Sequence, residues 1–415
     1  MKQTIQLGVL SALNIGIGFL FQWYVLTQLG PGVETDALFA GMTLPQLVLA
    51  VISGSLMHVL VPLLSGENKD NLHADAWGVF ILVGSLFGLI AVALYFTAFL
   101  WVPLTVPGFD NAGKVLTISL TRIQLIGMVF AAINGVQWAT YHAKQNFVWA
   151  EFTPIIASTF SLMLLVWALP RFGVIAAAWI SVVRMAVQSL LLAPGMGKPV
   201  WPDFKSRSII LAWQRIKPLV MGTVYYKTDP LVDRFLLSSA GSGSLSLYYL
   251  AQQIYGAASQ VLNRAVAAPL VPLLSKLNKT GNDSQYRQVY HQKLLQVGFV
   301  GVVSLLILGL FGKGVLGLLV SHGNVSAENV KELWWIMILL GGMFFGGTLA
   351  SITSSSFYAL GDTTTLVKVS MISYTGFIIC KVIAFFYWGL AGLAIATSIY
   401  YMTNLLIQMF YLRKR

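Results

Sequence analysis

The chain has 415 residues, of which 57% are hydrophobic and 10% are charged, and its mean hydropathy is +0.76. Soluble domains carry about 25% charged residues, so this composition excludes a soluble globular protein. The formal net charge of +12 would favour a nucleic-acid partner in a soluble protein, but membrane topology explains its distribution better. The single cysteine, Cys380, excludes an intrachain disulfide.

Apolar stretches of the length that crosses a bilayer, about 20 residues, recur along the whole chain. They predict an all-α polytopic membrane protein with about twelve transmembrane helices, near residues 4–27, 38–64, 76–100, 115–140, 148–169, 173–194, 208–238, 245–274, 293–312, 333–360, 365–387 and 389–411. Only Lys2 precedes the first stretch, which lacks a small-residue cleavage site. It therefore predicts a first membrane helix rather than a removed signal peptide.

The connections between the predicted helices are short and contain residues that break helices. Examples are Gly30-Pro31-Gly32, Pro107-Gly108, Pro194-Gly195 and Gly241-Ser242-Gly243. The segment 196–207 resembles a cytoplasmic linker. It divides the chain into a predicted N-terminal six-helix bundle, residues 1–195, and a C-terminal six-helix bundle, residues 208–415.

Lysine and arginine residues outside the spans indicate the orientation. With the N-terminus in the cytoplasm, sixteen of them fall on the cytoplasmic side and four fall on the opposite side, namely Lys114, Arg171, Lys313 and Lys331. Cytoplasmic loops of membrane proteins carry an excess of positive residues. The distribution therefore predicts that both termini are cytoplasmic, as an even number of spans requires.

An internal repeat relates the two halves. The segment Val61-Pro62-Leu63-Leu64-Ser65 recurs 210 residues later as Val271-Pro272-Leu273-Leu274-Ser275, and Asn68-Lys69 recurs as Asn278-Lys279. Each copy ends a helix that runs inward, and this helix is the second of its half. The repeat is therefore predicted to be parallel, with an axis along the membrane normal, and such repeats build transporters that rock around a midplane site.

Ionisable residues inside the predicted spans are mainly basic. Six carry positive charge, namely Arg122, Arg184, Lys227, Arg234, Arg264 and Lys381. A charge at mid-bilayer costs about 2.5–3.5 kcal/mol even on lenient insertion scales, so these side chains should face a wet cavity or a partner. Structural pairing and snorkelling to a headgroup are the alternatives, and snorkelling applies best to Arg122 and Arg234, near outer ends.

The seventh span has the highest density of charge. At 100° per residue, Asp229 and Asp233 share one face and Lys227 and Arg234 share another, and Pro230 should kink the helix between them. Two interpretations stay open for the aspartates: they neutralise basic residues of neighbouring helices, or they form a coupling site for Na+ or a proton. Together, six basic and two acidic groups leave the interior at +4, which favours an anionic substrate such as a phosphate.

Other motifs do not indicate an enzyme. The five histidines lack metal-ligand spacing, and no glycine-rich phosphate-binding loop is present. The run Thr353-Ser354-Ser355-Ser356 is typical of a helix packing face rather than of a nucleophile. The sequence therefore predicts neither a catalytic residue nor a cofactor.

Two stretches resemble a known family, the MurJ-type lipid-linked oligosaccharide flippases of the multidrug/oligosaccharidyl-lipid/polysaccharide exporter superfamily. The matching residues are Thr35-Asp36-Ala37-Leu38-Phe39, Leu44-Pro45, Gly54 and Val61-Pro62 in the first half, and Ser246-Leu247-Tyr248-Tyr249, Ala251 and Pro272-Leu273-Leu274-Ser275 in the second. The resemblance is clear over about 22–69 and 232–279. It implies a V-shaped pair of six-helix bundles that moves a lipid-linked sugar diphosphate outward by alternating access.

The chain also departs from that family pattern. Family members carry arginines in the first two helices, where this chain has none, and an Asp-Arg pair in the eighth helix, where it has Gln252-Gln253. They have fourteen helices, against twelve predicted here. The resemblance implies a sodium site formed by an acid of the seventh helix and polar groups of the eleventh and twelfth helices. In this chain Lys381 lies in that region. Its ammonium is predicted to replace the cation.

The leading prediction is a flippase of the bacterial inner membrane for an undecaprenyl-diphosphate-linked oligosaccharide, either a peptidoglycan precursor or a surface polysaccharide repeat unit. Its predicted substrate-binding residues are Arg122, Arg184, Lys227, Arg234, Arg264, Gln252 and Gln253, and its predicted coupling residues are Asp229, Asp233 and Lys381. Two alternatives remain. One is a non-transporting partner of a glycan polymerase or synthase, and the other is a cation-coupled drug antiporter.

Overall fold

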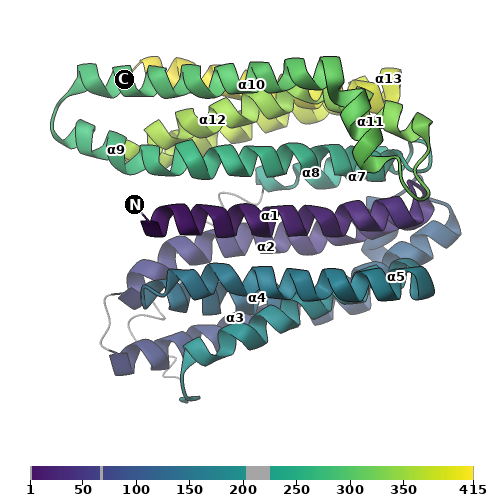
Figure 1. Cartoon of the computed structure of the whole chain (residues 1–415), viewed down its shortest axis with the longest axis horizontal. Coiled ribbons are helices and arrows are strands. Elements are labelled where there is room, and N and C mark those ends of the chain that lie inside the picture. The colour runs from purple at the N-terminus through teal and green to yellow at the C-terminus, as the bar shows by residue number, and fades with distance from the viewer. Residues whose placement is uncertain (1, 66–68, 202–224, 415) are drawn as a thin grey trace. The chain divides into compact units, whose positions relative to one another are not determined.

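The computed structural model describes residues 2–65, 69–201 and 225–414, and within them every regular element is a helix (Figure 1). The chain forms two compact units, residues 1–239 (unit 1) and 240–415 (unit 2). Unit 1 contains α1 (Lys2–Leu29), α2 (Val33–Ser65), α3 (Lys69–Thr105), α4 (Asn111–Ala143), α5 (Phe147–Leu192), η1 (Ala193–Met196) and α7 (Asp229–Leu237). Unit 2 contains α8 (Ser244–Leu262), η2 (Asn263–Ala267), α9 (Ala268–Lys279), α10 (Asp283–Val320), α11 (Ala327–Leu339), α12 (Gly341–Ala359) and α13 (Thr363–Arg413).

The boundary between the units falls later in the chain than the predicted linker. Residues 202–207 of that linker, and 208–224 of the predicted seventh span, lie outside the described residues. The described end of that span, α7, packs on α2 and α3 of unit 1. The backbone N–H of Gly108 donates to the Ser238 hydroxyl over 3.2 Å, which ties the end of α7 to the connection between α3 and α4. The division by packing therefore includes α7 in unit 1.

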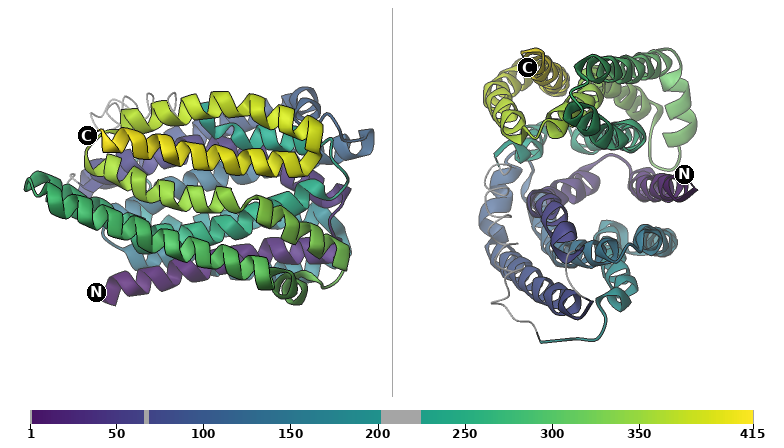
Figure 2. Two further views of the ribbon diagram at one scale, coloured as in Figure 1. Left: turned by 90° about the horizontal axis from the view of Figure 1, so that it is seen from above. Right: turned by 90° about the vertical axis from the view of Figure 1, so that its left-hand side faces the viewer.

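Two very long helices are hairpins. The indole N–H of Trp149 donates to the carbonyl oxygen of Leu191, 42 residues later, over 3.1 Å, whereas a continuous helix would separate the two residues by about 63 Å. In α13 the rings of Phe377 and Tyr400 are 5.7 Å apart. Each helix reverses at a glycine with positive φ, Gly173 at 62° and Gly389 at 55°, a conformation that glycine adopts without strain. The two arms of α13 lie side by side in Figure 2.

Two other predicted spans are helical but interrupted. The predicted span 245–274 consists of α8 and α9 joined by the π-helix η2. The predicted span 333–360 consists of α11 and α12, which are bent by 43° at Leu340. By length and composition, six described helices could each cross a membrane, or seven if the bent pair is one span. The total of twelve spans remains a prediction.

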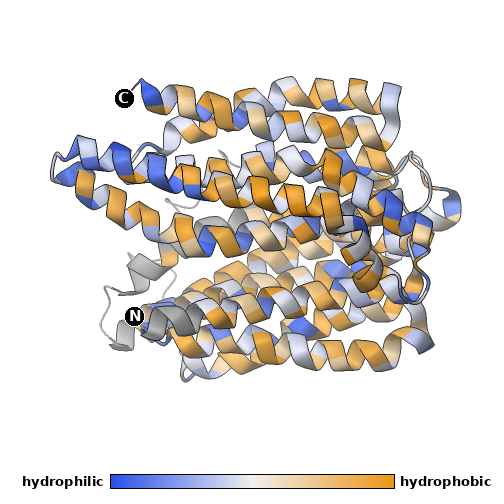
Figure 3. Ribbon diagram, turned by 45° about the horizontal axis from the view of Figure 1, so that its top comes forward, coloured by the Kyte–Doolittle hydropathy of each residue, from blue (hydrophilic) through white to orange (hydrophobic). Residues whose placement is uncertain are grey.

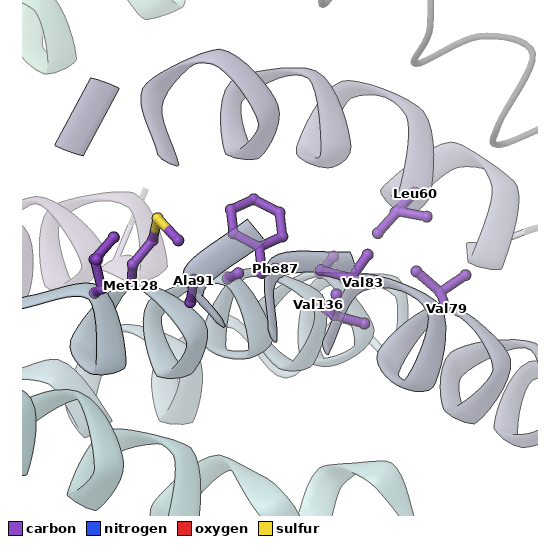
Figure 4. Packing of buried hydrophobic residues seen from close by; sticks show 10 residues of the cluster. Leu60, Val79, Val83, Phe87, Ala91, Met128 and Val136 are labelled. Atoms are coloured by element: carbon purple, nitrogen blue, oxygen red, sulfur yellow. The ribbon is translucent and has the colours of Figure 1, made fainter. Parts of the chain in front are cut away.

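Each unit has its own apolar core. In unit 1, α2, α3 and α4 meet around Leu60, Val83, Phe87 and Met128, all at most 2% exposed (Figure 4). In unit 2, Leu274 of α9, Val297 of α10, Ile352 of α12 and Leu405 of α13 form the corresponding cluster. Lipid tails are as apolar as these side chains, so close packing rather than exclusion of water favours such contacts within a membrane.

Apolar side chains also cover the outer surfaces of the long helices. Exposed examples include Leu89 and Leu104 in α3, Leu310 in α10 and Phe386 in α13. Figure 3 shows hydrophobic residues along the lengths of the helices and hydrophilic residues gathered toward their ends. Such a surface is compatible with lipid and not with water.

Candidate functional site

The charged helix α7 begins directly after a break. Residues 225–227 are helical, Thr228 forms a turn, and α7 starts at Asp229 with Pro230 in its first turn. The N–H of Leu231 bonds to the carbonyl of Thr228 over 2.9 Å. Proline is well accommodated in a first turn, where its missing N–H needs no partner. The irregular residue Thr228, directly before Asp229 and Pro230, is compatible with the helix kink predicted at this proline.

The charges in and beside α7 differ in exposure. Asp233 and Arg234 are buried, at 1% and 3% exposure, whereas Lys227 is exposed. Lys227 and Arg234, about two helical turns apart, therefore occupy different environments, and their common face stays a prediction. Asp229, one turn before Asp233, is half-buried, so the two aspartates keep their predicted spacing.

Arg122 lies at the contact between α3 and α4. Its Nε donates to the carbonyl oxygen of Tyr95 over 3.2 Å, and its guanidinium carbon is 5.0 Å from the centre of the Tyr95 ring. A cation over an aromatic face gains about 0.5–1 kcal/mol at an exposed position. This geometry gives Arg122 a packing role in unit 1, and its predicted contact with substrate remains untested.

A row of polar groups joins α4 to the second arm of α5, and the sequence reasoning missed it. The Ser181 hydroxyl donates to Gln124 over 3.1 Å, and the Asn134 amide donates to the carbonyl of Met185 over 3.0 Å. Farther along, Gln137 donates to the carbonyl of Ser189 over 3.1 Å. Residues 181, 185 and 189 are four residues apart and therefore lie on one helix face. This spacing is the sequence feature that could have indicated the contact with α4.

Arg184 lies beside that row. It precedes Met185 by one residue, so its side chain is about 100° away from the face that contacts α4. It is half-buried. The polar row fixes the rotation of this arm of α5 and thereby the direction of Arg184.

In unit 2, Arg264 lies in the π-helix η2. Its side chain is exposed, and Gln252 and Gln253 of α8 are half-buried. The hydroxyl of Ser355 in α12 lies 3.2 Å from the carbonyl oxygen of Ala267, the last residue of η2. π-Helical turns are rare overall, and those that occur often lie at functional sites. The contact from α12 therefore supports the irregular turn that presents Arg264.

The serine-rich run of α12 makes other bonds of the same kind. The hydroxyls of Tyr290 and Thr353 are 3.3 Å apart, and Ser354 donates to Gln408 over 3.3 Å. These bonds join α12 to α10 and α13. They support the predicted packing role of residues 353–356.

Lys381 is buried within unit 2, at 1% exposure, although it lies in the middle of an apolar arm of α13. Its ammonium nitrogen is 5.8 Å from the centre of the Tyr400 ring on the other arm. Nearby in sequence on that arm, Thr397 lies 3.1 Å from the Tyr248 hydroxyl of α8. Burying an ammonium costs several kcal/mol unless other groups compensate for the lost water. The burial of Lys381 therefore depends on groups of the surrounding helices, and its predicted role in coupling stays a prediction.

The predicted residues are thus distributed over both units. Unit 1 contains Arg122, Arg184, Lys227, Asp229, Asp233 and Arg234, and unit 2 contains Gln252, Gln253, Arg264 and Lys381. Within unit 1 the structure brings Asp229, Asp233 and Arg234 together on one short helix. Among the described residues no group of three His, Cys, Asp or Glu side chains could hold a metal ion.

Solved structures with the same fold are transporters. A structure described as lipid II flippase MurJ in an inward closed conformation matches with a TM-score of 0.86 and 18% sequence identity, covering 99% of this chain and 87% of that one. An inward-facing multidrug resistance MATE family transporter of the MOP superfamily matches with a TM-score of 0.78 and 17% identity, covering 98% and 94%. The fold is therefore that of a helical membrane transporter of the MurJ and MATE type.

The sequence identifies the family within this class. The family model described as "Lipid II flippase MurJ" matches residues 25–415, and the chain belongs to this family. A probable lipid II flippase MurJ of Vibrio cholerae is 23% identical over 425 residues, covering 96% of this chain and 80% of the relative. A lipid II flippase MurJ of Burkholderia cenocepacia is 22% identical over 423 residues, covering 96% and 81%. The predicted family is confirmed, and because its members are transporters, so is the prediction that the chain is not an enzyme.

Proposed function

We propose that this protein moves an undecaprenyl-diphosphate-linked oligosaccharide across the bacterial inner membrane by alternating access. The cargo is a peptidoglycan precursor or a surface polysaccharide repeat unit. The observation that carries the proposal is the family match over residues 25–415. The twelve spans, the two six-helix bundles and the cytoplasmic termini belong to the same proposal. The excess of basic residues in the predicted spans supports an anionic cargo of this kind.

Arg264, Lys227 and Arg184 are the main cations proposed to hold the diphosphate. Arg264 and Lys227 are exposed and Arg184 is half-buried, so none of them is sealed within a core. Guanidinium groups bind phosphate oxygens through two parallel hydrogen bonds, and an ammonium group binds them as a point charge. Arg122, Arg234, Gln252 and Gln253 are assigned supporting contacts with the cargo.

The coupling of transport is assigned to Asp229, Asp233 and Lys381. The two aspartates lie one helical turn apart in unit 1. A sodium ion or a proton is the natural ligand of such a carboxylate pair. The buried ammonium of Lys381 is proposed to replace a coupling cation in unit 2. With Lys381 in place of the cation, the carrier runs without a sodium gradient and responds to membrane potential, whereas sodium-dependent transport would assign the coupling to the aspartates.

The cargo site is tested with purified protein in vesicles that contain an undecaprenyl-diphosphate-linked oligosaccharide. We expect Arg264→Ala and Lys227→Ala each to lower the flipping rate by about tenfold or more, because a charge-assisted hydrogen bond contributes about 1.5–3 kcal/mol. Arg171→Ala is the matched control, since Arg171 is exposed and packs over Trp167 at 4.5 Å. Unchanged rates in both the Arg264→Ala and Lys227→Ala variants would rule out the assigned site.

The same experiment separates the alternatives. A partner subunit would show no flipping in vesicles, would co-purify with a glycan polymerase or synthase, and would tolerate both substitutions in cells. A drug antiporter would export organic cations and ignore the lipid-linked sugar. For coupling, a flipping rate that requires sodium in the wild-type protein would overturn the role given to Lys381.

A further inference from the structure

A cavity of about 760 Å3 lies at one end of unit 2. It is formed by the connection between α9 and α10, the end of α12 and the last turns of α13, close to the C-terminus in Figure 1. None of the residues assigned to cargo or coupling lines it. Its volume is in the range of small-molecule sites, about 300–1,000 Å3.

The inner wall of this cavity is fixed by hydrogen bonds. Tyr290 is 6% exposed, and its hydroxyl lies 3.3 Å from Thr353. One turn earlier on α10, the Tyr286 hydroxyl donates to the carbonyl of Ser356 over 3.2 Å. Both tyrosines line the cavity and are held by α12. The cavity is therefore formed before any ligand arrives, which lowers the entropy cost of binding.

The rim of the cavity is positively charged. Two exposed arginines line it, Arg287 on α10 and Arg413 at the end of α13, and Asp283 is the acid among its described lining residues. Lys276 and Lys279 occupy the last turn of α9 close by in the chain. The Lys414 ammonium lies 4.3 Å from the centre of the Phe410 ring, which also lines the cavity. The rim thus attracts an anion.

An apolar outer surface leads directly to this rim. On α13, Leu406 is 60% exposed and Phe410 is 55% exposed, and Arg413 follows within one turn. On α10, Leu295 is 73% exposed, about 12 Å along the helix from Arg287. Basic residues with aromatic neighbours at the end of an apolar stretch are typical of the headgroup level of a bilayer. A ligand at this place can keep its acyl chains in lipid.

We propose that this cavity binds the headgroup of an anionic phospholipid of the surrounding bilayer. Arg287 and Arg413 hold its phosphate, Tyr286 and Phe410 contact its glycerol, and its acyl chains run along the exposed apolar surface near Leu406. Basic pockets between membrane helices bind lipid headgroups in this manner. A soluble phosphate would gain nothing from the adjoining apolar surface, so the lipid is the better occupant. The site is separate from the transported cargo.

The test measures lipid retention by the purified full-length protein in detergent, with native mass spectrometry. Phosphatidylglycerol and phosphatidylcholine are offered in equal amounts. We expect the wild-type protein to retain phosphatidylglycerol preferentially and the double variant Arg287→Gln/Arg413→Gln to retain about tenfold less of it. The matched control is Lys313→Gln/Lys331→Gln. It removes two exposed charges elsewhere in unit 2, and Lys313 lies about 39 Å from Arg287 along α10.

A variant that is expected to raise lipid retention distinguishes loss of the site from misfolding. Asp283→Asn removes the acid that lines the cavity and should raise phosphatidylglycerol retention about threefold, a gain that misfolding cannot produce. The proposal is overturned if the arginine variant and the wild type retain equal phosphatidylglycerol, or if the lysine control loses as much. It is also overturned if millimolar inorganic phosphate displaces the lipid from the wild-type protein, because the cavity would then be a site for a soluble anion.

Discussion

In unit 1, α2 runs from Val33 to Ser65 as one uninterrupted α-helix, whereas the matching segment of unit 2 is divided by η2 into α8 and α9. The two segments are copies of one repeat with a constant offset of 210 residues. A π-turn places more residues in one turn than an α-turn does, so the residues after η2 are rotated relative to their counterparts in α2. Equal lengths of chain therefore present different faces, and Arg264 in the π-turn corresponds to Gly54 in a regular helix.

The copies also differ where a neighbouring helix approaches. A Cβ atom added to Gly41 of α2 would lie 3.0 Å from the Thr121 hydroxyl and 3.2 Å from its backbone nitrogen in α4. The corresponding residue of α8 is Ala251, which is fully buried. One copy thus needs glycine for a close helix contact, and the other accommodates a methyl group. The two matching segments therefore differ in how closely a neighbouring helix can approach.

The largest effect is expected when the segment α8–η2–α9 of unit 2 is made as continuous as α2 of unit 1. Deleting Ala265 removes one residue from η2 and should allow α8 and α9 to join as a continuous α-helix. We expect the flipping rate to fall to that of empty vesicles, because Arg264 changes direction, while helix content by circular dichroism stays the same. Ala265→Ser, which keeps the residue number, is the control. Normal flipping by the deletion variant would show that the π-turn is dispensable.

Gly41→Ala should destabilise unit 1 by about 1–3 kcal/mol, the usual cost of overpacking a close contact. Thermal unfolding in detergent, followed by tryptophan fluorescence, measures the loss. Gly16→Ala in α1 serves as its control, because a Cβ atom there would meet no atom within 4 Å. If both variants unfold at the same temperature, α2 and α4 do not need this close approach.

The reverse substitution in the second copy, Ala251→Gly, should cost less. It removes one buried methyl group, about 0.8 kcal/mol, and lowers helix propensity by a similar amount, for a total of about 1.7 kcal/mol, below the upper end of the range for Gly41→Ala. The same unfolding assay applies. A loss of stability larger than that of Gly41→Ala would mean that the buried methyl group of Ala251 contributes more to stability than the close approach of α4 at Gly41.

The smallest effect is expected from removing the hydroxyl of Ser355, which contacts the last residue of η2. Ser355→Ala removes a hydroxyl that lies near the carbonyl oxygens of both Ala267 and Ser351, and we expect a loss of about 0.5–1 kcal/mol with a two- to threefold lower flipping rate. Ser351→Ala is matched to it, since Ser351 donates within its own helix to Thr348. Equal flipping rates in the two variants would remove Ser355 from the support of Arg264.

Much of the helical arrangement could be predicted because apolar length and glycine are local signals. The hairpins at Gly173 and Gly389 match predicted spans that end near 169 and 387 and resume near 173 and 389. Helix α10 is longer than its predicted span 293–312, since it begins at Asp283 and ends at Val320. Its polar first turns lie beyond the apolar stretch, so hydropathy carries no signal for them.

The breaks and the environments of charges could not be predicted in the same way. The π-turn at 263–267 is contacted at its last residue by the hydroxyl of Ser355, which is distant in sequence. The apolar neighbours of Lys381 predict that it lies within a span, but they do not predict its 1% exposure. Arg234 is predicted near an outer end of its span, where snorkelling is an alternative, but it is 3% exposed. Hydropathy locates a residue along a helix and does not show what packs against it.

The single-glycine reversal in α13 has a consequence for how the protein enters its membrane during synthesis. The reversal follows three exposed aromatic residues, Phe386, Tyr387 and Trp388, and no charged residue lies between Lys381 and Gly389. Charges that could decide the direction of insertion occur at the other end of the hairpin, at Lys368, Arg413 and Lys414. We therefore expect the insertion machinery to take up the two arms as one cooperative unit, with the aromatic tip crossing first and settling at the far interface.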